Sequence, residues 1–269
     1  MPCHTCGRET DSRRRECETC DTPVGEPAVR PDQRTFPVRG VGRAASVAVA
    51  VTALCHLVAT LFPLPASLAA ERAARRLDPG GLLVVVLLDG AIAVAYVLAF
   101  LVAAVLVIVW CHRARRNLDA FPGAGPTLAT GWAVAGWLVP FVNVVVPYRV
   151  VANITRDSLW QPATPPLVKI WWAAWLVFYC GGSRIERLDR FEPDLPASPA
   201  TPADFAAYVD HYRGSLDWEL LPGLACLVAG VTLVALIERI SAAQQARIDR
   251  AQRYGPVTPG MVVPSPGLP

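Results

Sequence analysis

Five apolar stretches, separated by polar and proline-rich segments, dominate the hydrophobic pattern of this 269-residue chain. They cover residues 44–62, 82–110, 128–148, 167–182 and 220–237. A helix rises about 1.5 Å per residue and the hydrocarbon core of a bilayer is about 30 Å thick, so about 20 apolar residues cross it. The pattern therefore predicts an all-α, multi-pass transmembrane helical bundle of four to five spans.

The third apolar stretch differs from the others because Pro140, Asn143 and Pro147 interrupt it. Proline removes a backbone donor, so this stretch is expected either to kink while crossing or to re-enter the side it came from. If all five stretches cross with the N-terminus inside, 15 of the Lys and Arg residues lie inside and 10 outside; with four crossings the numbers are 18 and 7. Basic residues prefer the cytoplasmic side, which favours the re-entrant alternative.

The segments between and beyond the spans complete the predicted organisation. Residues 1–22 form a cysteine-rich head, residues 23–43 a linker rich in Pro, Gly and Arg, residues 44–254 the transmembrane domain, and residues 255–269 a disordered tail. Pro63 and Pro65 are expected to end the first span, and a short polar loop around Glu71 to lead to the second. A proline-rich acidic loop is expected from Arg184 to Glu219.

The head carries two CxxC pairs, and their four cysteines are Cys3, Cys6, Cys17 and Cys20. Two tight turns, each offering two thiolates, can complete a tetrahedral site, so the spacing predicts a zinc ribbon. Four protein ligands leave no open position for a substrate, and the zinc is therefore expected to be structural. His4 is a less favoured ligand. A redox role for the CxxC pairs is disfavoured, because it normally needs a thioredoxin-like fold that 22 residues cannot supply.

Composition supports a membrane location. The chain is 53% hydrophobic with a mean hydropathy of +0.36, and its 17% of charged residues gather outside the apolar stretches. Met1 leads directly into the cysteines without a secretion signal, and reduced thiols suit the cytoplasm, so we expect a multi-pass protein of the cell membrane with a cytoplasmic N-terminus. A net charge of +3 does not argue for nucleic acid as a partner.

Several polar residues are candidates for function in or beside the membrane. Asp89 is an acid inside the second apolar stretch, where an unpaired carboxylate is costly; it either serves a functional site or reaches interfacial water or an arginine such as Arg76. With Asn143 it forms the candidate intramembrane polar site, although Asn143 can also satisfy backbone groups freed by the prolines. His56 is expected to be a packed neutral imidazole. The candidate contacts to lipid head groups are Arg13, Arg14, Arg15, Arg113, Arg115 and Arg116.

No nucleophile elbow, paired-histidine zinc motif, phosphate-binding loop or dinucleotide fingerprint occurs in the sequence, so an enzyme is not expected. The favoured hypothesis is a non-catalytic membrane scaffold or sensor that recruits a protein partner through its zinc head. The alternative is a small-solute or ion permeation protein that uses Asp89 and the broken third segment. Membrane lipid and a second copy of the chain are further candidate partners; alanines at every fourth position from Ala91 to Ala103 would allow close helix packing.

From His112 onward the sequence resembles an actinobacterial membrane family named domain of unknown function 4328. The matching residues are His112-Arg113-Ala114-Arg115-Arg116-Asn117-Leu118, Gly131-Trp132, Gly136-Trp137, Pro140, Asn143, Pro147-Tyr148, Val150-Val151 and Trp171-Trp172-Ala173-Ala174-Trp175. The resemblance covers most of residues 44–250. It implies a helical membrane architecture, often with an N-terminal pair of CxxC motifs, and it implies no particular activity.

Overall fold

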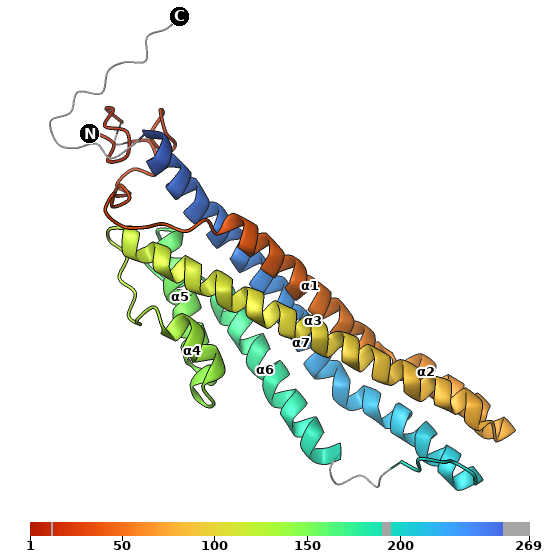
Figure 1. Ribbon diagram of the computed structural model, residues 1–269. Coiled ribbons are helices and arrows are strands. Elements are labelled where there is room, and N and C mark those ends of the chain that lie inside the picture. Colours follow the sequence, from red (N-terminus) through yellow and green to blue (C-terminus); the bar gives the residue numbers. More distant parts are fainter. Residues whose placement is uncertain (12, 190–194, 255–269) are drawn as a thin grey trace, which may run out of the picture. The chain divides into compact units, whose positions relative to one another are not determined.

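The computed structural model describes residues 1–11, 13–189 and 195–254, and within them it is all-helical, as the sequence predicts (Figure 1). The α-helices are α1 (Arg39–Leu61), α2 (Pro63–Arg76), α3 (Pro79–Asn117), α4 (Trp132–Leu138), α5 (Val146–Ser158), α6 (Pro166–Asp189) and α7 (Pro202–Tyr254). Two 3-10 turns, η1 (Leu118–Ala120) and η2 (Val142–Val144), complete the described elements. The tail predicted for residues 255–269 lies outside the described residues.

The chain divides into two compact units. Unit 1 comprises Met1–Ala44, Val107–Val168 and the described residues from Leu236 on, and unit 2 comprises Ala45–Leu106 and Lys169–Ala235. Helices α1, α3, α6 and α7 each have one end in unit 1 and the rest in unit 2.

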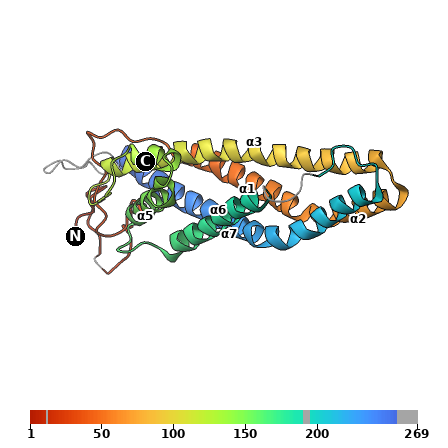
Figure 2. The ribbon, with the colours of Figure 1, turned by 90° about the horizontal axis from the view of Figure 1, so that it is seen from below.

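Three helical segments of the described chain are long and apolar enough to cross a membrane, which suggests a membrane protein. These segments are Arg39–Arg76, Pro79–Ala120 and Trp218–Tyr254, and Pro166–Gly181 is a shorter apolar helix. In unit 2 the helices α1, α3, α6 and α7 run side by side (Figures 1 and 2). Large apolar side chains such as Leu87 and Leu98 are more than half exposed, which suits contact with lipid rather than water.

Small residues bring α1 and α7 close together within unit 2. A Cβ at Gly230 would lie 3.1 Å from the Cβ of Ala53, and one at Gly223 would lie 2.6 Å from the Thr60 side chain. Glycine at these positions therefore permits the close backbone approach that drives helix association in lipid.

The structure corrects the loop predicted after the first span. Residues 63–76 form helix α2 instead, with Pro63 in its first turn, where proline costs no hydrogen bond. The alanine-rich segment that follows has a strong helix propensity. Ala66, Ala70 and Ala73 are buried, and the prolines thus start a second helix rather than a loop.

The predicted 184–219 loop is also mostly helical. Helix α6 continues to Asp189, and α7 begins at Pro202. The start of α7 is a capping box, in which the Asp204 carboxylate accepts from the amides of Ala200 and Thr201 at 2.9 and 2.8 Å. These amides lower the pKa of Asp204. The Thr201 hydroxyl accepts from the Asp204 amide at 3.3 Å, which completes the box.

These added helical segments build a core of their own in unit 2. It is composed of Ala66, Ala70, Ala73, Leu82, Val85, Phe205, Tyr208, Val209 and Tyr212, from α2 and the first turns of α3 and α7. An ion pair of 2.8 Å between Arg213 and Glu71 joins α7 to α2 at its edge.

The third apolar stretch is broken in unit 1. Helix α4 ends at Leu138, the turn η2 follows, and α5 begins at Val146 and packs against α4. Phe141 lies at the break with a positive φ of 64° and a side chain that is 91% exposed. The stretch is therefore two short helices joined by an apolar turn.

Candidate functional site

The four head cysteines converge into one cluster. The Sγ atoms of Cys3 and Cys20 lie 3.6 Å apart, those of Cys6 and Cys17 lie 3.7 Å apart, and all four lie within 4.8 Å of one another. A tetrahedral metal with metal–sulfur bonds of about 2.3 Å would hold its sulfurs about 3.8 Å apart. The quartet thus has the spacing of a four-thiolate metal site. His4 is exposed and lies outside the cluster.

Each CxxC pair is held by the same set of backbone hydrogen bonds, repeated 14 residues later. In the first knuckle, Gly7 N donates to Cys3 O and Cys3 N to Arg8 O, both at 2.8 Å. In the second, Asp21 N donates to Cys17 O and Cys17 N to Thr22 O, both at 2.9 Å. Antiparallel bridges close the two loops, between Pro2 and Glu9 and between Glu16 and Pro23.

The repeat explains why the residue after each second cysteine matters. Gly7 has a φ of +71° and Asp21 a φ of +52°, so both occupy the left-handed region. Glycine adopts this region without strain, and aspartate tolerates it better than most residues. Asp21 therefore departs from the knuckle pattern in residue type but not in geometry.

The thiols of the cluster differ in acidity. Burial disfavours ionisation of Cys17, but hydrogen bonds from the Thr10 side chain and from the amides of Thr19 and Cys20 outweigh it and lower the pKa of Cys17 to about 6. Burial raises the pKa of Cys6 to about 12 and also raises that of Cys20. One thiolate is thus favoured, and further ionisation needs a neighbouring cation.

Two contacts dock the N-terminal part of the chain onto the end of α7, one from the head and one from the start of the linker. Tyr254 packs against the cysteine cluster, and its hydroxyl donates to the Thr19 carbonyl at 2.8 Å. The Glu26 carboxylate is 6% exposed and forms ion pairs of 3.0 Å with both Arg247 and Arg250. The Arg247 guanidinium is 5% exposed and lies over the Phe121 ring, 4.4 Å from its centroid.

The linker predicted for residues 23–43 is also docked rather than free. The Asn117 side chain holds the backbone of Phe36 at both ends, accepting from its N–H at 2.7 Å and donating to its carbonyl at 2.9 Å. Asn117 also donates to Gln244 at 2.9 Å, and Gln244 donates to the Ser158 hydroxyl at 2.8 Å. Both amides are fully buried. Helix α1 begins at Arg39, inside the predicted linker.

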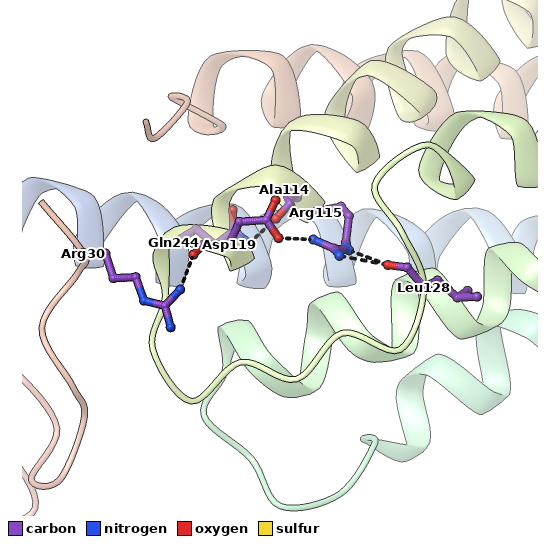
Figure 3. Close-up of polar contacts among 6 residues, drawn as sticks. All are labelled: Arg30, Ala114, Arg115, Asp119, Leu128 and Gln244. Atoms are coloured by element: carbon purple, nitrogen blue, oxygen red, sulfur yellow. Dashed lines mark hydrogen bonds and ion pairs between the residues drawn. The ribbon is translucent and has the colours of Figure 1, made fainter. Parts of the chain in front are cut away.

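Arg115 is corrected from a lipid contact to an internal residue (Figure 3). It is 6% exposed, and its guanidinium donates to the Leu128 carbonyl at 2.8 and 3.2 Å and to Asp119 at 2.8 Å. Arg115 thus holds the loop that follows α3 in place. Arg30 also contacts this region, donating to the Asp119 carbonyl at 3.4 Å. The guanidinium is therefore occupied within the protein.

The other arginine candidates lie at the surface of unit 1. Arg13, Arg14 and Arg15 are exposed on the head, and Arg14 pairs with Glu18 at 2.7 Å. Arg116 is exposed, and Arg113 is half-buried with a bond of 3.4 Å to the Pro37 carbonyl. The candidate arginines thus form two sets, one on the cysteine head and one at the end of α3.

The proposed polar pair is not assembled within one unit. Asp89 is half-buried in unit 2, where it interacts with His211 and hydrogen-bonds Tyr212 of α7. Asn143 belongs to unit 1, and its buried Oδ1 has no protein partner among the described residues. His56 packs between the rings of Tyr96 and Phe178, at 4.9 and 5.1 Å. This placement gives no support to a permeation path through Asp89 and Asn143.

Sequence reasoning missed the polar core of unit 1 that Asn117 and Gln244 form. Two signals were available: Asn117 lies within the basic motif that carries the resemblance, and Gln244 lies in the charged C-terminal part of α7, from Glu238 on. A fully buried amide needs partners for each of its polar atoms, and the partners come from segments distant in sequence.

These observations define a protein whose described residues are helical, with three membrane-length helices among them and a four-cysteine head. The chain belongs to the family described as a domain of unknown function (DUF4328), which matches residues 75–242. The matched range includes α3 to α6 and most of α7, and it excludes the cysteine head. No curated protein and no solved structure matches the chain.

Proposed function

We propose that this protein is a non-catalytic, multi-pass membrane scaffold or sensor that recruits a protein partner through a zinc-loaded cytoplasmic head. The observation that carries the proposal is the closed thiol quartet, docked onto the end of a membrane-length helix by Tyr254. Such a head is a rigid surface module with no position open for a substrate.

Zinc is the metal that best suits the donor set. Four thiolates in a tetrahedral arrangement select zinc or an iron–sulfur centre, and the two tight knuckles are typical of structural zinc. Bound zinc would supply positive charge that stabilises all four thiolates and would hold the two knuckles together. The chain itself contributes the backbone turns and the Tyr254 contact.

Contacts within unit 1 support an even number of membrane crossings. The head contacts the C-terminal end of α7 through Tyr254, and the start of the linker contacts it through Glu26, which pairs with Arg247 and Arg250. The head precedes α1, and α7 is the last helix, so an odd number of crossings would put the two partners on opposite sides of the bilayer. Three long apolar helices and α6 give four crossings, and the α4–α5 hairpin then does not cross.

The charge of unit 1 supports its placement on the cytoplasmic side. It holds eight arginines in residues 1–44, five in residues 107–168 and four from residue 236 on, against seven, two and two acidic residues in the same segments. Unit 1 thus holds 17 of the 25 Lys and Arg residues of the chain, and cytoplasmic segments near spans usually show such an enrichment in basic residues.

The recruitment proposal is tested by crosslinking in native membranes, followed by capture of the tagged full-length chain. One variant replaces the metal quartet (Cys3→Ser, Cys6→Ser, Cys17→Ser, Cys20→Ser), and the control replaces Cys55 and Cys226 instead. We expect about one zinc per chain and a specific crosslinked protein in the wild type and the control, and loss of both in the quartet variant. A set of captured proteins that does not change with the quartet would refute recruitment through the head.

A further inference from the structure

A cluster of arginines without acidic partners surrounds the start of α1 in unit 1. Its members are Arg34, Arg39, Arg43, Arg113 and Arg116. Among the residues that the structure describes, none of the five has a carboxylate within ion-pair distance. The neighbouring Arg115, by contrast, is neutralised by Asp119.

Phe36 gives this cluster a fixed platform. The guanidinium of Arg116 lies over its ring at 4.8 Å from the centroid, and that of Arg34 lies at 5.3 Å. The ring is itself positioned, because Asn117 holds the Phe36 backbone by two hydrogen bonds of 2.7 and 2.9 Å. Stacking on an aromatic face orients the planar guanidinium while leaving its N–H groups free to donate.

The remaining arginines border this platform along the chain. Arg113 is tied to the Pro37 carbonyl, one residue after Phe36. Arg39 and Arg43 lie four residues apart on the same face of the first turns of α1, and both are exposed. The uncharged run that begins at Ala44 follows directly, so the cluster is adjacent to the apolar part of α1.

Two guanidinium groups held on one ring repel each other unless an anion lies nearby. Phosphate is the anion that best suits them, because guanidinium groups donate to its oxygens in pairs. We propose that Phe36, Arg34, Arg116 and the adjoining Arg113, Arg39 and Arg43 form a binding site for the phosphate of an anionic phospholipid in the cytoplasmic leaflet. This inference rests on the proposed membrane topology, which brings the start of α1 to the level of the head groups.

The site differs from a general excess of positive charge in having a defined geometry. Arg13 and Arg15 carry equal charge on the cysteine head but have no aromatic platform among the described contacts. A double replacement of Arg34 and Arg116 can therefore be compared with a double replacement of Arg13 and Arg15, which removes the same charge elsewhere. Arg13, Arg15, Arg34 and Arg116 are all exposed, so neither variant disturbs a core.

The test measures lipid binding to the purified full-length protein in a neutral detergent by native mass spectrometry. We expect the wild type and Arg13→Gln/Arg15→Gln to retain phosphatidylglycerol in preference to phosphatidylcholine. Arg34→Gln/Arg116→Gln should weaken phosphatidylglycerol binding by roughly 25-fold, since each of the two basic residues near an anionic surface contributes roughly five-fold. Equal binding by the two double variants, or no preference for phosphatidylglycerol in the wild type, would overturn the proposal.

A second arm of the test separates lipid from soluble phosphate. Millimolar inorganic phosphate should not displace the bound phosphatidylglycerol; displacement at that concentration would assign the site to free phosphate and overturn the lipid assignment. This readout requires neither a bound zinc nor a protein partner, so its failure is distinguishable from failure of the recruitment proposal.

Discussion

The hydroxyl of Tyr254, in the last turn of α7, donates a 2.8 Å hydrogen bond to the carbonyl of Thr19, which lies between the two cysteines of the second knuckle. The partners are 235 residues apart in sequence. This contact joins the cysteine cluster to the end of a membrane-length helix. It provides a direct route by which the state of the head could affect the helix.

Removing the Tyr254 hydroxyl should loosen the head without unfolding the helices. We expect Tyr254→Phe to lower the stability of the docked head by about 1 kcal/mol, the usual net contribution of one hydrogen bond. Tyr254→Ala should lose more, because the ring also packs against the cysteines. Amide hydrogen exchange of residues 1–22 measures the effect, and the exposed Tyr179→Phe serves as control. Unchanged protection of the head in Tyr254→Ala would contradict the docking.

The left-handed backbone at Asp21 predicts a stabilising substitution. Asp21→Gly should make the second knuckle match the first and should stabilise the head by up to about 1 kcal/mol, because glycine adopts a positive φ without strain. Gly7→Ala should have the opposite effect at the equivalent position, where φ is +71°. Competition with a zinc chelator at fixed pH measures the zinc affinities of the wild type and the two variants, and we expect Asp21→Gly to bind most tightly and Gly7→Ala least tightly. The prediction fails if both substitutions weaken zinc binding equally.

The knuckles differ from the Glu26 latch, the ion pairs of buried Glu26 with Arg247 and Arg250, in how well they could be predicted from the sequence. The cysteine spacing alone indicates the quartet, because ligand geometry demands a fixed local separation. Glu26, Arg247 and Asn117 could not be assigned in that way, because their partners lie up to 224 residues away and charged residues are usually exposed. The loops predicted after the first span and at residues 184–219 were wrong for a different reason. Proline can end one helix or occupy the first turn of the next, and α2 and α7 begin at Pro63 and Pro202.

The buried Glu26 latch should be sensitive to the loss of a single partner. Glu26→Ala leaves Arg247 buried without its counter-ion, and we expect a loss of about 3–5 kcal/mol in the stability of unit 1. The double variant Glu26→Leu/Arg247→Met should recover much of this loss, since it removes both buried charges. Limited proteolysis within residues 23–38 monitors the latch. If Glu26→Ala resists proteolysis as well as the wild type does, the ion pair contributes little to the stability of unit 1 and the prediction is wrong.

Metal loading should release fewer protons than four free thiols would. The pKa of Cys17 is lowered to about 6, so at pH 7 this residue is already a thiolate and releases little. Cys6 and Cys20 have raised pKa values and should each release a proton when the metal binds.

The sign of the pH dependence follows from these values. As the pH falls through 6, Cys17 becomes protonated in the metal-free head, so one more proton must leave on binding and zinc affinity should fall more steeply. Titration of the protein with zinc in weakly buffered solution, at pH values above and below 6, counts the protons released on binding. Cys17→Ser is the comparison, because it should abolish this change in slope; a slope that stays constant through pH 6 in the wild type would contradict the assignment.

The contact between Tyr254 and Thr19 also predicts where the C-terminus lies. Because α7 ends beside the head, a reporter fused after residue 269 should be on the same side as a reporter fused before Met1, and we expect both on the cytoplasmic side. A fluorescent protein that folds only in the cytoplasm should therefore be bright at both ends, and a phosphatase active only outside should be silent at both. The same phosphatase inserted between Leu195 and Ala200, before α7, should be active, since four crossings put this connection outside. A silent insertion there, or a phosphatase active at the C-terminus, would mean that α6 does not cross or that the α4–α5 hairpin does, and the four-crossing topology would have to be abandoned.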